Sequence, residues 1–233
     1  MASTTRLTRR NFAVLTGLAV VLVLAVTLIL ILRPQPAPSA NAPATTTTAP
    51  TAAAATPANG CPALDENTAT PNAAPRTSWE LVAGAAVPKT AAGPGITTGM
   101  TRRCYARTPL GAVSAAANFS TLLGVEGGAE TVLNEQTTRG PIRDALLASS
   151  ANVSRVQGAA VPQLRGFALA EYDGRTAMVQ LAWGNRGQLY ASTAAVTWDG
   201  QDWKLDGDPP RVIPQVRPIT ALDGFVPWSG VGS

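Results

Sequence analysis

Residues 163–172 read QLRGFALAEY, residues 176–183 read TAMVQLAW, and residues 188–198 read QLYASTAAVTW. Apolar and polar residues alternate along each run, which is typical of a strand with one buried face. The pairs Asp173–Gly174 and Asp199–Gly200 end the first and third runs, and Asp-Gly between alternating runs is a strong hairpin signal. The sequence therefore predicts an antiparallel meander, with a fourth short strand after the second turn.

Helical spacing of apolar residues precedes the meander. Thr108 and Pro109 predict a helix start, with Thr108 as the N-cap and Pro109 at the first helical position, and this helix should end near Gly124. Shorter helices are expected at residues 129–135 and 142–148. Helices that come before an antiparallel meander indicate an α+β fold.

Residues 61–100 are rich in proline and are expected to be mostly loop, with residues 79–82 as the one extended piece that packs. The glycines of residues 93–99 are similar to a dinucleotide-binding loop, but their spacing is G-x-G-x-x-x-G, and neither a strand nor a helix start flanks them. We therefore predict a plain loop there and no cofactor.

Residues 12–32, from Phe12 to Leu32, form an apolar run without a charged residue. As a helix this run is about 30 Å long, the thickness of the hydrocarbon core of a bilayer. It is longer than the apolar region of a cleaved signal peptide, which has about 7–15 residues. Most of the flanking arginines lie before it, so residues 1–11 are predicted to be a cytoplasmic arm. We expect a single-pass cell-membrane protein whose C-terminal domain is extracellular.

Residues 33–60 consist almost wholly of Pro, Ala, Thr, Ser and Asn. Such a segment buries too little apolar surface to fold, and we expect a disordered linker. The domain plan is then an arm, a membrane helix, a linker, and an extracytoplasmic α+β domain at residues 61–233 with a proline-rich tail.

The formal net charge of +4 invites a nucleic-acid interpretation. However, four of the 18 basic residues flank the apolar run, and the other 14 balance the 14 acidic residues. A nucleic-acid-binding protein needs a basic face. We therefore predict no nucleic-acid partner.

Two cysteines, Cys61 and Cys104, lie on the side predicted to be extracellular. Two cysteines in an oxidising compartment most simply form a disulfide. The chain contains no histidine, which excludes Ser-His-Asp triads and histidine metal sites. Tyr172 and Asp173 could be imagined in catalytic roles, but a turn favours Asp for its backbone geometry alone. We predict no catalytic residue, no metal site and no enzymatic activity.

Three tryptophans of the meander, Trp183, Trp198 and Trp203, are expected to pack on one face of the sheet. An aromatic platform for a ligand is the alternative interpretation of the same spacing.

Several motifs together suggest a known group of proteins. The relevant stretches are GCP at 60–62, WELV at 79–82, RCYA at 103–106, VTWDGQDWKL at 196–205 and GFVPW at 224–228. With the anchor and linker, they resemble actinobacterial membrane-anchored NTF2-like proteins, such as conjugation components of the VirB8/TcpC type and Mce-associated membrane proteins. The resemblance implies helices packed on a curved meander, and a role in an envelope complex.

Five residues are candidate contacts for a partner protein. Arg102, Arg103 and Arg107 cluster before the first predicted helix, and a basic cluster can attract acidic groups. The tail after Pro209 is apolar for a proline-rich segment, so it either wraps back over the domain or docks on a partner through residues such as Phe225 and Trp228. We expect a structural or assembly subunit of an envelope complex, with a conjugation-type secretion apparatus as the candidate complex and a lipid- or wall-binding module as the alternative.

Overall fold

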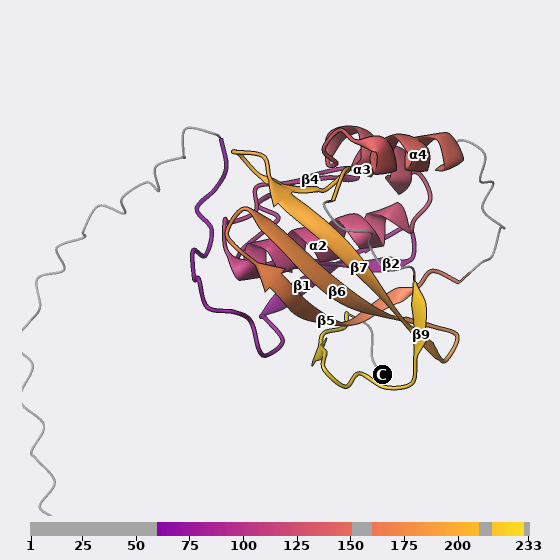
Figure 1. Cartoon of the computed structure of the whole chain (residues 1–233). Coiled ribbons are helices and arrows are strands. Elements are labelled where there is room, and N and C mark those ends of the chain that lie inside the picture. Colours follow the sequence, from indigo (N-terminus) through magenta and orange to yellow (C-terminus); the bar gives the residue numbers. More distant parts are fainter. Residues whose placement is uncertain (1–59, 151–159, 210–215, 231–233) are drawn as a thin grey trace, which may run out of the picture. The chain divides into compact units, whose positions relative to one another are not determined.

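In the computed structural model, the alternating runs form the antiparallel meander that their sequence predicts (Figure 1). The structure describes residues 60–150, 160–209 and 216–230. The strands of this sheet are β5 (Gln163–Tyr172), β6 (Thr176–Asn185), β7 (Gln188–Trp198), β8 (Trp203–Leu205), β9 (Arg217–Ile219) and β10 (Val226–Pro227). Their order is β10-β5-β6-β7-β8, and β9 also pairs with β7.

One face of the meander forms the core. In the register of β6 with β7, Val179 lies opposite Ala194 and Ala177 lies opposite Val196, and all four side chains are buried. Because side chains alternate between the two faces of a strand, the apolar positions all reach the same side. Helix α2 lies across this side, behind β5, β6 and β7 in the view of Figure 1.

Helix α2 (Pro109–Leu123) begins and ends where its sequence predicts. The Oγ1 atom of Thr108 accepts a hydrogen bond from the backbone N–H of Gly111, and Pro109 occupies the first turn. The helix is buried on most of its surface because it packs against strand β2 (Ala85–Thr90) on one side and against the meander on the other. Its many alanines allow this close approach on both sides.

Two shorter helices follow, α3 (Gly128–Glu135) and α4 (Pro141–Ser150). Both lie within a residue or two of the predicted positions. The α+β class is therefore confirmed: three helices and antiparallel sheets are present in the described residues.

The region expected to be mostly loop contains two hairpins instead. Strand β1 (Thr77–Val82) pairs with β2 (Ala85–Thr90), and β3 (Ile96–Thr98) pairs with β4 (Thr101–Arg103). Pro88 lies within β2 although it cannot donate a hydrogen bond, because β2 pairs with β1 alone and its other edge needs no donor at that position. The expectation of loop at residues 93–99 is thus wrong for β3.

The three tryptophans of the meander lie on its core face, as predicted. Trp198 lies opposite Trp203 in the register, and their rings meet edge to face at 5.6 Å between centroids. Trp203 is fully buried, while Trp183 and Trp198 pack against the core with part of their surface exposed.

The predicted arm at residues 1–11, the predicted membrane helix at residues 12–32 and the predicted linker up to residue 59 lie outside the described residues. Within the described part of the chain, no helix is both long enough and apolar enough to cross a membrane.

Candidate functional site

The predicted disulfide is present. Cys61 and Cys104 are bonded, with 5.5 Å between their Cα atoms, a separation in the usual range for disulfides. The bond joins the start of the domain to the segment between β4 and α2. Cys104 has a left-handed backbone with φ of 67°, which is uncommon for a residue with a side chain.

Asp202 holds the backbone around Cys104. Its carboxylate accepts hydrogen bonds from the N–H groups of Cys104 at 2.7 Å, of Tyr105 at 2.9 Å and of Trp203 at 2.9 Å. The Trp203 indole donates to the carbonyl of Ala106 at 2.9 Å. Burial raises the pKa of Asp202, and the three N–H donors oppose that effect. The role of Asp202 is to clamp the disulfide-bearing segment to β8.

We expect Asp202→Asn to lower the free energy of unfolding by about 2–3 kcal/mol, because an amide presents one acceptor oxygen where the carboxylate has two, and a buried N–H is left unpaired. Chemical denaturation followed by circular dichroism measures the change. Asp208→Asn makes the same charge change at an exposed position nearby and should shift stability by less than about 0.5 kcal/mol. Equal losses in the two variants would contradict the clamp.

The three arginines expected as one partner-binding cluster are separated in the fold. Arg102 is only 1% exposed. Its guanidinium binds Glu80 on β1 at 3.1 Å and the carbonyl of Gly99 at 2.6 Å. The expectation that Arg102 contacts a partner is therefore wrong, because its side chain is buried and joins the β3–β4 hairpin to β1.

The other two arginines are exposed. The Nε of Arg107 donates to the carbonyl of Gly174 at 2.7 Å, and its guanidinium lies over the ring of Trp198 at 5.8 Å from the centroid. Arg107 therefore joins the entry of α2 to the β5–β6 turn. Partner contacts by Arg103 and Arg107 remain predictions.

Trp228 is a core residue. It is 3% exposed, its indole donates to the Oγ1 of Thr77 at 2.9 Å, and its ring lies 5.4 Å from that of Phe167 and 5.5 Å from that of Trp79. The expectation that Trp228 contacts a partner is wrong, because the described tail wraps over the domain. Phe225, which is half-buried, stays a predicted contact.

Tyr172 and Asp173 make hydrogen bonds that stabilise the fold. Asp173 accepts hydrogen bonds from the N–H groups of Arg175 at 2.7 Å and Thr176 at 2.6 Å, and these bonds lower its pKa. The Tyr172 hydroxyl donates to the carbonyl of Arg107 at 3.3 Å. This is the hydrogen-bonding pattern of an Asp that stabilises a turn.

The space between α2 and the meander is filled by side chains. Ala112, Ala115, Ala116 and Phe119 of α2 are fully buried there, beside Phe167 of β5. Across residues 60–150, 160–209 and 216–230, no group of three or more metal-ligating side chains comes together. The interior is a packed core.

Helix α4 exposes two large apolar side chains. Ile142 is 38% exposed and Leu146 is 43% exposed, and as residues i and i+4 they lie on one face of the helix. Helix α4 packs against α3 and leaves part of each of these two side chains exposed.

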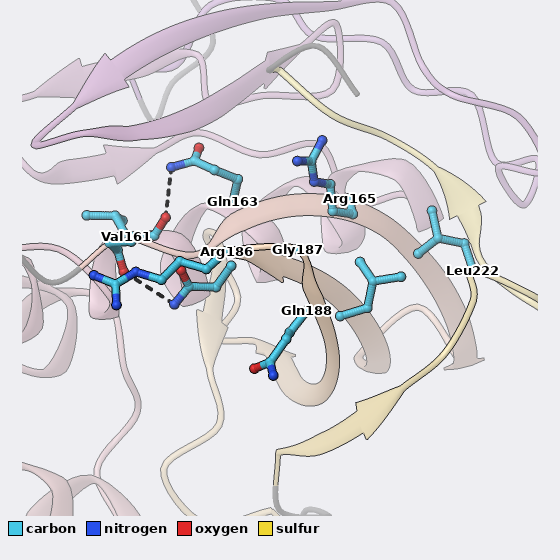
Figure 2. Close-up of a pocket in the computed structure, with 11 residues that line it drawn as sticks. Val161, Gln163, Arg165, Arg186, Gly187, Gln188 and Leu222 are labelled. Atoms are coloured by element: carbon cyan, nitrogen blue, oxygen red, sulfur yellow. Dashed lines mark hydrogen bonds between the residues drawn. The ribbon is translucent and has the colours of Figure 1, made fainter.

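A pocket of about 410 Å³ lies at the end of the meander. Figure 2 shows its walls, which come from the start of β5, the β6–β7 hairpin and Leu222 in the tail. Its ionisable residues in the described chain are Arg165 and Arg186. The sequence alone does not predict this pocket, because its walls come from segments far apart in the chain.

Comparison with known proteins gives a family. A family model described as a domain of unknown function, DUF8175, matches residues 41–227. No curated protein and no solved structure matches the chain.

Proposed function

Because the chain belongs to the family of the domain of unknown function DUF8175, whose description names no reaction, we propose a function from the sequence and the structure together. The protein is a non-enzymatic structural or assembly subunit of a cell-envelope complex. Its domain binds partner proteins outside the cytoplasm, in a complex of the conjugation-secretion type.

The observation that carries this proposal is the exposed apolar face of α4. Ile142 and Leu146 are one helical turn apart, and they are 38% and 43% exposed. Burial of a fully exposed side chain of this size is worth about 1.5–3 kcal/mol, so covering the exposed two fifths of each would stabilise a complex by about 1 kcal/mol per side chain. Residues at i and i+4 are among the anchors of a helix that lies in a groove of its partner. Single exposed apolar residues are common on surfaces, so the pair on one face is what supports docking.

The packed interior supports a binding role over an internal ligand site. An NTF2-like cone that holds a ligand needs a hollow, whereas Phe119 and the alanines of α2 fill this space. The alternative of a lipid or cell-wall ligand inside the cone is therefore less favoured. The NTF2-like arrangement itself is part of the proposal, supported by helices that lie on one face of an antiparallel meander.

The location in the cell is also a proposal. The run from Phe12 to Leu32 has the length and composition of a membrane helix, and residues 33–60 would carry the domain away from the bilayer. The disulfide of Cys61 with Cys104 fits an oxidising compartment outside the cytoplasm.

Site-specific photocrosslinking in the native cell tests the assembly role. A photoreactive amino acid replaces Leu146 in the full chain, and we expect a defined adduct with a protein of the envelope fraction. The control places it at Asp144, which lies about 200° around the helix from Leu146. The adduct at residue 144 should be much weaker, because its side chain faces away from a partner that covers the face of Ile142 and Leu146.

A second variant separates docking from proximity. Ile142→Ser should reduce the adduct formed from residue 146, because it removes the other half of the apolar pair. If residue 146 gives no adduct, or if residues 144 and 146 give equal ones while the chain is present in the membrane fraction, the assembly role through α4 is overturned.

A further inference from the structure

The pocket at the end of the meander carries an inference that does not depend on the assembly role. We propose that it binds a small organic anion, in which a carboxylate or phosphate group is attached to a short apolar body. The two parts of this ligand correspond to the two kinds of side chain that line the pocket.

The anionic group is indicated by the charge of the pocket. Arg165 on β5 and Arg186 in the β6–β7 turn both line it, and none of its described lining residues is acidic. Figure 2 shows the side chains of Arg165 and Arg186 extending in different directions, so either guanidinium alone can meet the anionic group. Guanidinium groups present a planar set of donors that matches carboxylate and phosphate oxygens.

The apolar body is indicated by the walls. Val161, Leu189 and Leu222 line the pocket beside the two arginines. A volume of about 410 Å³ is within the range of small-molecule sites, which are mostly apolar with a few charged or polar groups. An inorganic anion alone would leave this apolar surface uncovered.

The backbone at the pocket accommodates the arginines. A Cβ atom at Gly184 would lie 2.6 Å from the Nε of Arg165, so glycine at this position lets the Arg165 side chain lie across β6. Arg186 is the first residue of a two-residue turn and has a left-handed φ of 49°. Asn or Gly is preferred in such turns, so the turn geometry does not account for an arginine there.

Calorimetric titration of the full chain in lipid nanodiscs tests the proposal, with empty nanodiscs as the blank. The probes are butyl phosphate, inorganic phosphate and butanol. We expect saturable binding of one butyl phosphate per chain, weaker binding of inorganic phosphate, and no saturable binding of butanol. Absence of saturable butyl phosphate binding in the millimolar range overturns the proposal.

Two variants locate the site. Arg186→Asn removes the charge and gives the turn the sequence Asn-Gly, which is favoured in two-residue turns, so the variant should fold at least as well as the parent. We expect it to weaken butyl phosphate binding about tenfold or more, the loss of one charge-assisted hydrogen bond. Arg165→Met should weaken binding to a similar degree and keep the apolar stem.

The matched control is Arg175→Asn in the β5–β6 turn, at the other end of the strands, where the side chain is exposed. It should leave the affinity unchanged. Equal weakening by Arg175→Asn and Arg186→Asn would mean that net charge alone attracts the probe, and would overturn the site. If inorganic phosphate binds as tightly as butyl phosphate, the proposed contact of an apolar body with the pocket walls is overturned. The α4 crosslink reports on another face and does not depend on either result.

Discussion

Replacement of Trp228 by alanine is expected to lower the free energy of unfolding by about 3–5 kcal/mol, the usual cost of removing a buried aromatic side chain. The indole is 3% exposed and lies between the rings of Phe167 and Trp79, at 5.4 Å and 5.5 Å. The substitution also leaves the Oγ1 of Thr77 without the N–H donor that it has at 2.9 Å. A residue in the proline-rich tail would thus support much of the fold.

The measurement is urea unfolding of the full chain, followed by far-UV circular dichroism because fluorescence would lose one of its reporters. Phe225→Ala is the control in the same tail. Phe225 is half-buried and packs beside Gly166, so we expect a loss of about 1 kcal/mol or less. Trp228→Phe should retain most of the stability, since it keeps an aromatic ring in contact with Phe167 and Trp79. A loss below about 1 kcal/mol for Trp228→Ala would show that the tail is not part of the folded core.

The meander and the helices could be predicted because their signals are local. Alternation along residues 163–198 and the Asp-Gly turns fix both the strands and their connections, and the Thr108 cap fixes the start of α2. The β1–β2 hairpin gave no such signal. Pro88 interrupts it, and only the tertiary arrangement leaves the edge of β2 where proline is tolerated.

The partner contacts were less predictable because exposure depends on long-range packing. Arg102 and Arg103 are neighbours in the sequence, yet alternation along β4 buries the first and exposes the second. Glu80, the partner of Arg102, lies 22 positions earlier. Trp228 meets Thr77 across 151 positions. The apolar tail did carry a usable signal, since a proline-rich segment with this apolar content is expected to be covered.

Asp202 shows how a local motif can hide a long-range role. The pair Asp199–Gly200 predicts a turn that leads into a strand at Asp202, and Asp199 does form this turn through the N–H groups of Gln201 at 2.9 Å and Asp202 at 2.8 Å. The second aspartate instead binds the backbone of residues almost 100 positions earlier. The sequence contains one hint of this long-range role, because Asp202 stands at the start of a strand, directly before a tryptophan that is predicted to pack in the core.

Removal of the disulfide is expected to have the other large effect. In the chain-entropy model, a bond that closes a separation of 43 residues stabilises the fold by about 4 kcal/mol, because it restricts the unfolded chain. The double variant Cys61→Ala with Cys104→Ala removes the bond and leaves no free thiol. Its free energy of unfolding should fall by about that amount, as measured by denaturant unfolding with tryptophan fluorescence, and the parent protein under a reductant should behave in the same way.

Removal of the disulfide should increase local opening near Cys61 more than in the rest of the fold. This difference separates the local loss of contacts from the effect of the bond on the unfolded chain. Cys61 begins a segment whose contacts include the bond from the Asp65 N–H to the carbonyl of Ala91 at 2.9 Å and the packing of Pro62 on Gly95. The clamp of Asp202 on Cys104 and Tyr105 remains in the double variant. Amide exchange of Asp65 should therefore rise by more than that of β6 amides at equal global stability. An unchanged free energy of unfolding in the double variant would mean that the unfolded chain is already compact in this region, and that Asp202 alone positions the residues before α2.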